Sequence, residues 1–186
     1  MIGVGETFPD FTLEGIDWEN EIYTETLEGV MDYGTEWAII YFYPKDFTFI
    51  CPTEILGFDE VGKELCNTVN PSGHGLLDVS VWGISPDNEY CKLAWKKDND
   101  LIRGTEHSLL ADSGNVLANE LGIVGNGNVP YRATYVVNTF DGRIHHVSVT
   151  RTDTGRNPDE IKRTVMALSA EGLTGCNWQA GDDFVA

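Results

Sequence analysis

The amino-acid sequence predicts an α/β fold in which a mixed central sheet carries helices on both faces. Short apolar runs, rich in β-branched and aromatic residues, alternate along the chain with longer segments of helical periodicity. The run from Trp37 to Tyr43 is continuously apolar, which is typical of a strand that is covered on both faces. Asp141 and Gly142 join two later strand-like runs and predict an antiparallel hairpin, so the sheet should contain both kinds of pairing.

The elements of the first half follow from periodicity and from the residues that begin each helix. Edge strands or a hairpin are expected around 8–13, a central strand at 37–43, a long helix at 52–69, a strand at 76–84 and a helix from 85 towards 101. Pro52 favours the first turn of the long helix, because its missing N–H group costs nothing there. Ser85 as N-cap and Pro86 at N1 likewise predict the start of the next helix.

The second half continues with a strand at 108–111, a short helix at 116–121 ending at Gly122, strands at 133–138 and 143–150, and a last helix from 157. Asn157 is expected to cap this last helix, with Pro158 at N1 and Glu160 in the capping-box position. The order of elements fits a thioredoxin-like fold. Residues 1–186 are expected to form a single domain, in which 172–186 follow the last helix as a C-terminal tail.

The charge balance excludes two classes of partner. The chain carries 12 Lys and Arg against 30 Asp and Glu, a formal net charge of -18. Such a surface repels phosphate backbones and anionic headgroups, so we expect neither nucleic acid nor a membrane as a partner. The densest apolar run is far shorter than the roughly 20 residues that span a bilayer. The first residues do not resemble a secretory signal, and a cytoplasmic location is expected.

The four cysteines, at 51, 66, 91 and 176, form no C-x-x-C pair and have no zinc-ligand spacing. This spacing disfavours a thioredoxin-type disulfide oxidoreductase and gives no reason to expect a metal site. In a reducing compartment the cysteines should be thiols. Cys66 and Cys91 fall on predicted helices among apolar neighbours, and we interpret them as bystanders.

Cys51 differs from the other cysteines because it stands between the central strand and the long helix. The unpaired amides and positive dipole end of that helix would favour its thiolate. Thr48 lies three residues earlier, where its hydroxyl could donate to the sulfur or to a bound oxygen substrate. Pro44 would shield the thiolate from water. A lone cysteine is more often a small buried hydrophobe, but a Cys-Pro pair at this junction favours a reactive thiol.

The segment Phe42-Tyr43-Pro44-Lys45-Asp46-Phe47-Thr48-Phe49-Ile50-Cys51-Pro52-Thr53-Glu54 contains Pro44-x-x-x-Thr48-x-x-Cys51. This motif resembles the active-site motif of the peroxiredoxins, most closely the bacterial alkyl hydroperoxide reductase C group of two-cysteine enzymes. The resemblance continues through Ala94-Trp95 and residues 131–137 to Cys176, so it covers the chain from about Glu6 onward.

The resemblance implies a thiol-dependent peroxidase that reduces hydrogen peroxide and small organic hydroperoxides. Cys51 matches the peroxidatic cysteine, which becomes a sulfenic acid. Thr48 and Arg132 match the residues that hold the peroxide, and Pro44 matches the residue that caps the pocket. A fixed Arg132 cation would also stabilise the thiolate. Cys176 resembles the resolving cysteine, which usually comes from a neighbouring subunit and closes a disulfide.

The resemblance also implies the partners. The disulfide would be reduced by thioredoxin or by a flavoprotein disulfide reductase, and the protein itself would bind no cofactor and no metal. Reciprocal resolution would require a homodimer, and the family's dimers can assemble into a decamer.

Several alternatives stay open from the sequence. Trp178 follows Cys176 by two residues, where the family more often has Cys-Pro-x-x-Trp, so a one-cysteine peroxidase reduced by an external thiol is an alternative. A peroxide sensor or holdase would use the same Cys51 chemistry. Glu54 would either support arginines of the site such as Arg132, or simply stabilise the helix N-terminus as an acidic residue in the first turn. Trp95 would either pack the tail and subunit contact or belong to the core.

Overall fold

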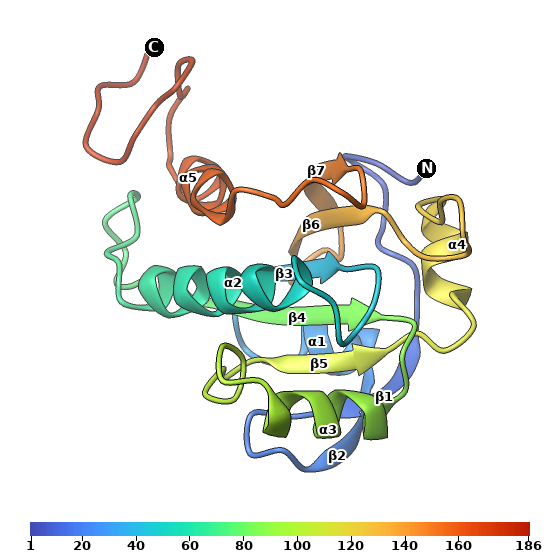
Figure 1. Cartoon of the computed structure of the whole chain (residues 1–186). Coiled ribbons are helices and arrows are strands. Elements are labelled where there is room, and N and C mark those ends of the chain that lie inside the picture. The colour runs from blue at the N-terminus through green and yellow to red at the C-terminus, as the bar shows by residue number, and fades with distance from the viewer.

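The computed structural model describes residues 1–186 and contains one seven-stranded mixed sheet in the order β2-β1-β5-β4-β3-β6-β7 (Figure 1). The strands are β1 (Thr12–Ile16), β2 (Ile22–Thr26), β3 (Trp37–Phe42), β4 (Val79–Ser85), β5 (Ser108–Ala111), β6 (Arg132–Asn138) and β7 (Ile144–Thr150). The helices are α1 (Leu27–Met31), α2 (Cys51–Cys66), α3 (Glu89–Asp98), α4 (Val116–Leu121) and α5 (Pro158–Leu168). Strands β3, β4 and β5 are parallel neighbours, and every other pairing is antiparallel.

The sheet separates two apolar cores, because alternate side chains of each strand point to opposite faces. On β3, Ile39 and Tyr41 pack with residues of α2, α3 and α5, whereas Ile40 and Phe42 pack with residues of α1 and α4. Figure 1 shows α2 crossing in front of the sheet and α1 behind it. All six residues of β3 are buried, as its continuous apolar run predicts. The predicted thioredoxin-like α/β architecture, with helices on both faces, is confirmed.

The predicted start of the helix after β4 is wrong. Ser85 is the last residue of β4, where it pairs with Ala111 of β5, so the strand continues through the predicted cap. Helix α3 begins at Glu89, and its N-cap is Asn88, whose Oδ1 accepts from the Cys91 amide at 2.8 Å. The strand ladder therefore outcompetes the capping preference of Ser85.

The last helix begins as predicted, but its capping box does not form. Asn157 is the N-cap and Pro158 opens α5, with Asn157 Oδ1 accepting from the Asp159 amide at 3.1 Å. The Glu160 carboxylate instead accepts hydrogen bonds from Arg163, at 2.8 Å each. Glu160 thus forms an ion pair with Arg163 along the helix, instead of the expected hydrogen bond to the backbone amide of the N-cap residue.

The sequence did not predict α1. This helix has only five residues, so it shows no helical period. Its N-cap Thr26 accepts from the Gly29 amide at 2.9 Å, and its buried Val30 packs on the second core. No helix of the chain has the length and apolar character needed to cross a bilayer.

Candidate active site

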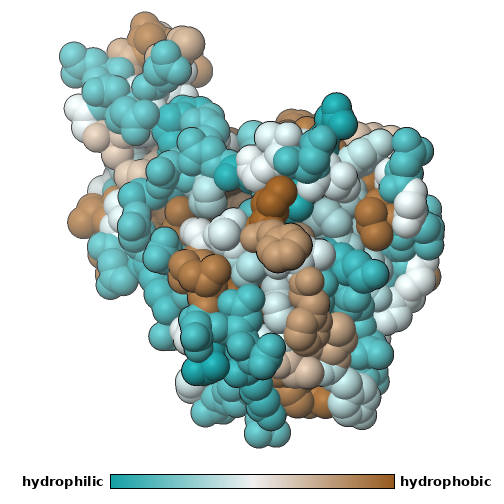
Figure 2. Space-filling view, in the orientation of Figure 1, coloured by the Kyte–Doolittle hydropathy of each residue, from teal (hydrophilic) through white to brown (hydrophobic).

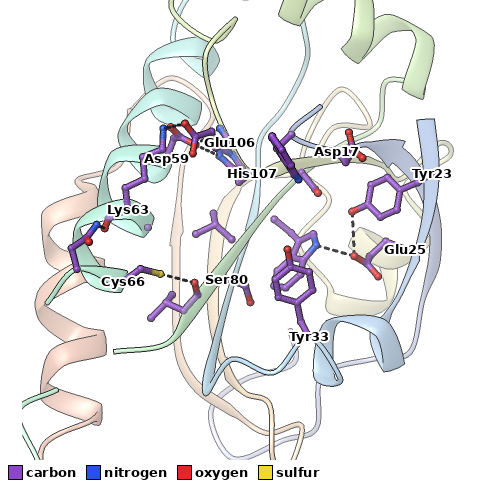
Figure 3. A pocket seen from close by; sticks show the side chains of 17 residues that line it. Asp17, Tyr23, Glu25, Tyr33, Asp59, Lys63, Cys66, Ser80, Glu106 and His107 are labelled. Atoms are coloured by element: carbon purple, nitrogen blue, oxygen red, sulfur yellow. Dashed lines mark hydrogen bonds and ion pairs between the residues drawn. The ribbon is translucent and has the colours of Figure 1, made fainter. Parts of the chain in front are cut away.

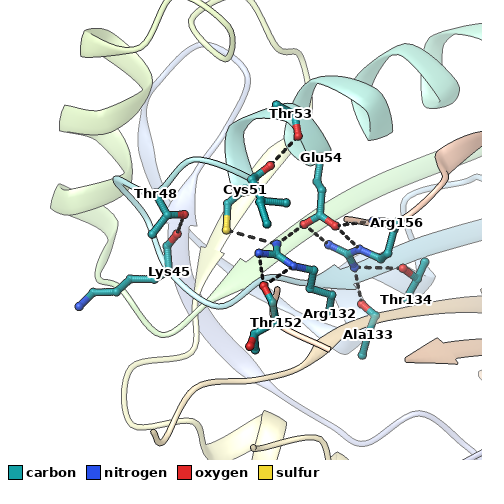
Figure 4. A network of polar contacts seen from close by, with 11 residues as sticks. Lys45, Thr48, Cys51, Thr53, Glu54, Arg132, Ala133, Thr134, Thr152 and Arg156 are labelled. Atoms are coloured by element: carbon teal, nitrogen blue, oxygen red, sulfur yellow. Dashed lines mark hydrogen bonds and ion pairs between the residues drawn. The ribbon is translucent and has the colours of Figure 1, made fainter. Parts of the chain in front are cut away.

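Cys51 is the first residue of α2 and lies just beyond the carboxyl end of β3, with its side chain pointing inward (Figure 4). Its exposed fraction is 1%. The N-cap Ile50 makes no side-chain cap, and its carbonyl accepts from the amides of Thr53 and Glu54 at 3.0 and 3.3 Å. The sulfur therefore sits at the positive end of a 16-residue helix, where a negative charge is stabilised.

Arg132 brings a fixed cation to this sulfur. It opens β6, which pairs with β3, and the two strands place its Nη1 atom 3.4 Å from Cys51 Sγ. Its Nε and Nη2 atoms donate to the Thr152 carbonyl at 3.0 and 2.6 Å. Because the guanidinium is buried and held from its far side, it cannot swing away from the sulfur.

Glu54 lies one turn after Cys51 and binds two arginines. Its Oε2 atom accepts from Arg132 Nη1 at 2.5 Å and from Arg156 Nη2 at 3.0 Å. Burial raises the pKa of Glu54, but the hydrogen bonds and charge of Arg156, and then the charge of Arg132, outweigh burial and hold this pKa below its usual range. Glu54 is thus an ionised bridge between the arginines, rather than only a favourable acid at a helix N-terminus.

Arg156 is the residue of this cluster that the sequence analysis missed. It lies between β7 and α5, and its backbone amide and Nε both donate to Glu54 Oε1, at 3.0 and 2.9 Å. Its Nη1 atom donates to the Ala133 carbonyl at 2.8 Å and to Thr134 Oγ1 at 3.1 Å. The residues around Arg156 in the sequence give no sign that it is buried, and they would suit a solvated residue just before a helix N-cap equally well.

The stacked rings of Tyr41 and Phe58 pack against the Arg156 guanidinium. Its guanidinium lies 5.3 Å from the centre of the Tyr41 ring and 5.0 Å from that of Phe58, and these rings stack at 4.2 Å. Gly83 of β4 allows this arrangement, because a Cβ atom there would lie 2.5 Å from Tyr41 Oη. The Tyr41 hydroxyl in turn hydrogen-bonds His107 Nε2 at 2.7 Å. The arginine that holds Glu54 thus rests directly on the core.

The loop before α2 is tied down by a buried polar cluster. Asp46 Oδ1 accepts from Ser85 Oγ at 3.0 Å and lies 3.5 Å from Lys92 Nζ, while the Asp46 amide donates to Asp87 Oδ2 at 2.8 Å. Lys92 also donates to Ser85 Oγ at 2.5 Å and to Tyr43 Oη at 3.2 Å. Strand β4 and helix α3 therefore fix the position of residues 44–50 beside the sulfur.

Thr48 and Pro44 belong to this loop. Figure 4 shows Thr48 beside Cys51, with its hydroxyl directed at the Lys45 carbonyl, to which it donates at 2.9 Å. The Thr48 hydrogen is thus committed to the backbone, not to the sulfur, and its oxygen lone pairs remain available as acceptors. Pro44 is buried at the base of the loop.

Apolar side chains surround the loop on the outside. Phe47 and Phe49 are exposed, and Figure 2 shows apolar atoms near the centre of this face, where the loop lies. Trp95 of α3 is buried in the core, and its ring lies 5.9 Å from that of Phe47. Within one chain, Trp95 therefore supports the loop as a core residue.

The structure does not bring Cys176 to Cys51. Cys176 is exposed in residues 172–186, which project beyond α5 as a separate arm (Figure 1). His74 Nε2 lies 3.8 Å from Glu171 Oε1, which places the start of this arm beside the segment that follows α2. Cys51 lies at the other end of α2, whose 16 residues span about 24 Å. All four cysteines are free thiols.

The arm has its own packing. Trp178 is buried and stacks with Phe184 at 6.0 Å, and its Nε1 donates to the Asp182 carbonyl at 3.1 Å. Arg163 Nη1 of α5 donates to the Trp178 carbonyl at 3.3 Å. Residues 178–184 therefore fold back on themselves at the end of α5.

A thiol at the start of a helix, at the carboxyl edge of a thioredoxin-like sheet, is the arrangement found in the peroxiredoxins, a class of thiol-dependent peroxidases. The chain belongs to the AhpC/TSA family, which matches residues 4–147. It is 30% identical to the alkyl hydroperoxide reductase C of Mycolicibacterium smegmatis, over 98% of this chain and 92% of that protein. It is also 30% identical to the chloroplastic 2-cysteine peroxiredoxin of Chattonella marina, over 97% and 90%.

Solved structures agree with this assignment. The reduced 2-Cys peroxiredoxin of Plasmodium vivax has a TM-score of 0.82 at 28% identity, covering 99% of this chain and 93% of that one. Mycobacterium tuberculosis AhpC has a TM-score of 0.80 at 27% identity, covering 96% and 99%. The protein is a peroxiredoxin and therefore a thiol-dependent peroxidase.

Proposed function

We propose that Cys51 is the peroxidatic cysteine of this enzyme. The observation that carries the proposal is the 3.4 Å contact between Arg132 Nη1 and the buried Cys51 sulfur. The thiolate attacks the terminal oxygen of a hydroperoxide, so that an S–O bond forms as the O–O bond breaks. The leaving alkoxide or hydroxide takes a proton from water, and Cys51 becomes a sulfenic acid.

Arg132 and Thr48 bind the peroxide in this proposal. Arg132 stabilises the charge that moves onto the leaving oxygen, since it is already oriented and needs no rearrangement. Thr48 accepts a hydrogen bond from the peroxide hydroxyl, which suits an oxygen whose own hydrogen is given to Lys45. Pro44 closes the base of the loop and keeps water from the sulfur. The substrates are hydrogen peroxide and small organic hydroperoxides.

Cys176 is proposed as the resolving cysteine, acting from a second copy of the chain. The length of α2 separates the two thiols within one chain, and the exposed arm suits exchange with a neighbour. The Cys176 sulfur attacks the Cys51 sulfenic sulfur, releasing water and forming a disulfide. Because Cys51 is buried, the first turn of α2 must unwind before the sulfurs meet.

The proposal includes the partners of the enzyme. Reciprocal exchange of arms gives a homodimer, which can assemble further into a decamer. Thioredoxin or a flavoprotein disulfide reductase restores the thiols by dithiol exchange. Four free cysteines suit a compartment in which thiols stay reduced, so we place the protein in the cytoplasm.

One equivalent of hydrogen peroxide added to the fully reduced protein tests the proposal, read by intact mass and non-reducing electrophoresis. The wild type is expected to become a covalent dimer that dithiothreitol separates. Cys51→Ser and Cys176→Ser should not dimerise, whereas the matched controls Cys66→Ser and Cys91→Ser should dimerise like the wild type.

Other results would redirect the assignment. An added oxygen on Cys51 with no dimer would indicate a one-cysteine peroxidase, and an internal disulfide would indicate Cys66 or Cys91 as the resolving thiol. Unchanged consumption of peroxide by Cys51→Ser would contradict the proposed role of Cys51. Turnover with a reductase separates the enzyme from a sensor or holdase.

A further inference from the structure

A cavity lies at the opposite end of the sheet from Cys51, where the sheet has a gap. Strand β4 pairs with β3 over residues 79–84, but β5 joins β4 only from Trp82 onward. The outer edge of β4 before Trp82 therefore has no strand partner. It opens into a cavity of about 500 Å³ between the second half of α2 and the β1–β2 hairpin (Figure 3). This volume lies within the range of small-molecule sites.

Glu25 of β2 points into this cavity without a cation. Its exposed fraction is 8%, and none of the ion pairs of the chain includes it. Its Oε2 accepts from Trp82 Nε1 and from the Tyr23 hydroxyl, at 3.1 Å each, and its Oε1 accepts from the Thr26 amide at 3.1 Å. These donors orient the carboxylate but leave its charge unpaired, and buried charges in proteins are normally paired.

Aromatic side chains form the walls around this carboxylate. Tyr33 and Trp82 meet edge to face at 5.5 Å, and Tyr23, whose hydroxyl donates to the same Glu25 oxygen as Trp82 Nε1, lines the cavity beside them. Trp18 and Tyr33 are 56% and 63% exposed, which is unusual for large aromatic residues and places them at the mouth. Aromatic faces attract organic cations and also pack against apolar groups.

The other charges of the cavity also favour a cation. Asp17, Asp59 and Glu106 line it together with a single ammonium, that of Lys63. Lys63 Nζ already pairs with Asp59 at 2.9 Å and with Glu106 at 3.1 Å. The Lys63 ammonium is therefore already paired on the side of the cavity formed by α2. The acidic side chains that line the cavity outnumber this ammonium, so the net charge of the lining is negative.

We propose that this cavity binds a small organic cation, an amine or guanidinium joined to an apolar body. The charged end pairs with Glu25, and the apolar body lies between Tyr33 and Trp82. The site is separate from the peroxidase centre, so it does not depend on the role proposed for Cys51.

Cys66 provides a direct reporter, because it lines the cavity and is only partly buried. The probe is 2-phenylethylammonium, and its neutral N-acetyl derivative is the matched ligand control. Calorimetry on the reduced full-length protein should show saturable binding of the cation. Alkylation of Cys66 by iodoacetamide, resolved by peptide mass, should slow several-fold at saturation. Alkylation of Cys91, which lies outside the cavity, should not change.

Variants identify the group that holds the charge. Glu25→Gln keeps the size of the side chain and should weaken binding about tenfold or more. Glu106→Gln, at an exposed position of the cavity lining, should bind within about twofold of the wild type. If Glu25→Gln melts early, the exposed Tyr33→Leu serves in its place and should weaken binding severalfold.

Three results would overturn the proposal. The first is the absence of saturable binding of 2-phenylethylammonium up to about 10 mM. The second is equal affinity in the wild type and Glu25→Gln. The third is equal binding of the neutral N-acetyl derivative. The last result would define an apolar pocket rather than a cation site.

Discussion

Arg156 holds Glu54 through three hydrogen bonds, two from its guanidinium and one from its own backbone amide, at 2.9 to 3.0 Å. Glu54 in turn accepts from Arg132, which contacts the Cys51 sulfur at 3.4 Å. The hydrogen bonds of Arg156 go to Glu54, Ala133 and Thr134 and none goes to the sulfur, so Arg156 acts on the thiol only through Glu54 and Arg132. It is a positioning residue.

Arg156→Lys keeps the positive charge but cannot reproduce the fork that binds both carboxylate oxygens. Glu54 and Arg132 then lose their fixed orientation, and kcat/KM for hydrogen peroxide should fall about tenfold or more. Stopped-flow kinetics measures this change, and the alkylation rate of Cys51 should fall in parallel. Arg151→Lys is the control, since Arg151 is exposed and pairs only with exposed Asp153. An unchanged kcat/KM in Arg156→Lys would show that Glu54 is positioned without Arg156.

Thr48→Val should lower kcat/KM by about tenfold to a hundredfold, because the substitution removes the acceptor proposed for the peroxide hydroxyl while keeping the side-chain size. Thr48→Ser should retain most of the activity. The matched control is Thr53→Val, which removes a hydroxyl that donates to the Ile50 carbonyl at 2.7 Å in the first turn of α2. Equal losses in Thr48→Val and Thr53→Val would assign the effect to the loop rather than to peroxide binding.

Lys92→Met tests the buried cluster under the active-site loop. Burial lowers the pKa of Lys92, although the negative charges of Asp46 and Asp87 act to raise it. Burial likewise raises the pKa of Asp46, although the positive charge of Lys92 acts to lower it. Removing only the lysine leaves a buried carboxylate without its cation, and the free energy of unfolding should fall by about 3 kcal/mol or more.

The double variant Lys92→Met/Asp46→Asn is the control for that prediction. It removes both charges and should recover most of the loss, measured by urea unfolding of the reduced protein. If the single and double variants are equally unstable, the loss comes from packing and the pair contributes little.

Asp59 should give the protein part of its stability against acid. Burial raises the pKa of Asp59, but hydrogen bonds from His107, Lys63 and the Glu106 amide outweigh burial and lower it to about 2. The unfolded value is about 3.9, so this stabilisation is complete above about pH 4 to 5 and is lost as the pH falls towards 2. Urea unfolding of Asp59→Asn should show a smaller decrease in stability across this range, and lower stability at pH 7. Exposed Asp100→Asn should keep the wild-type slope.

The sequence predicts best the positions of residues whose neighbours along the chain carry the relevant pattern. The apolar run before Cys51 and Pro52 after it predict that Cys51 lies between a strand and a helix. The structure confirms this, because Cys51 follows β3 and is the first residue of α2. Arg132 could be connected to Cys51 only through the resemblance to the peroxiredoxins, because the two residues meet through the pairing of β3 with β6.

Arg156 and Ser85 show why the remainder was not predicted. The side chain of Arg156 is buried against Glu54, which lies 102 residues away in the chain, and no periodicity or capping signal in the sequence predicts that contact. Ser85 has the residue type and the following proline of a helix start, yet the ladder to β5 keeps it in a strand. In both cases a long-range contact outweighs a local preference.

The cluster around Cys51 carries no excess of negative charge, since two guanidinium groups face the single carboxylate of Glu54. The formal net charge of -18 therefore comes from the side chains outside this cluster, and it sets the long-range field that an approaching substrate meets. Hydrogen peroxide is neutral and crosses that field unhindered, so its encounter rate is independent of ionic strength. An anionic hydroperoxide is repelled before it reaches the arginines, and added salt relieves that repulsion. Discrimination by substrate charge thus begins at the acidic outer surface, before the substrate reaches the sulfur.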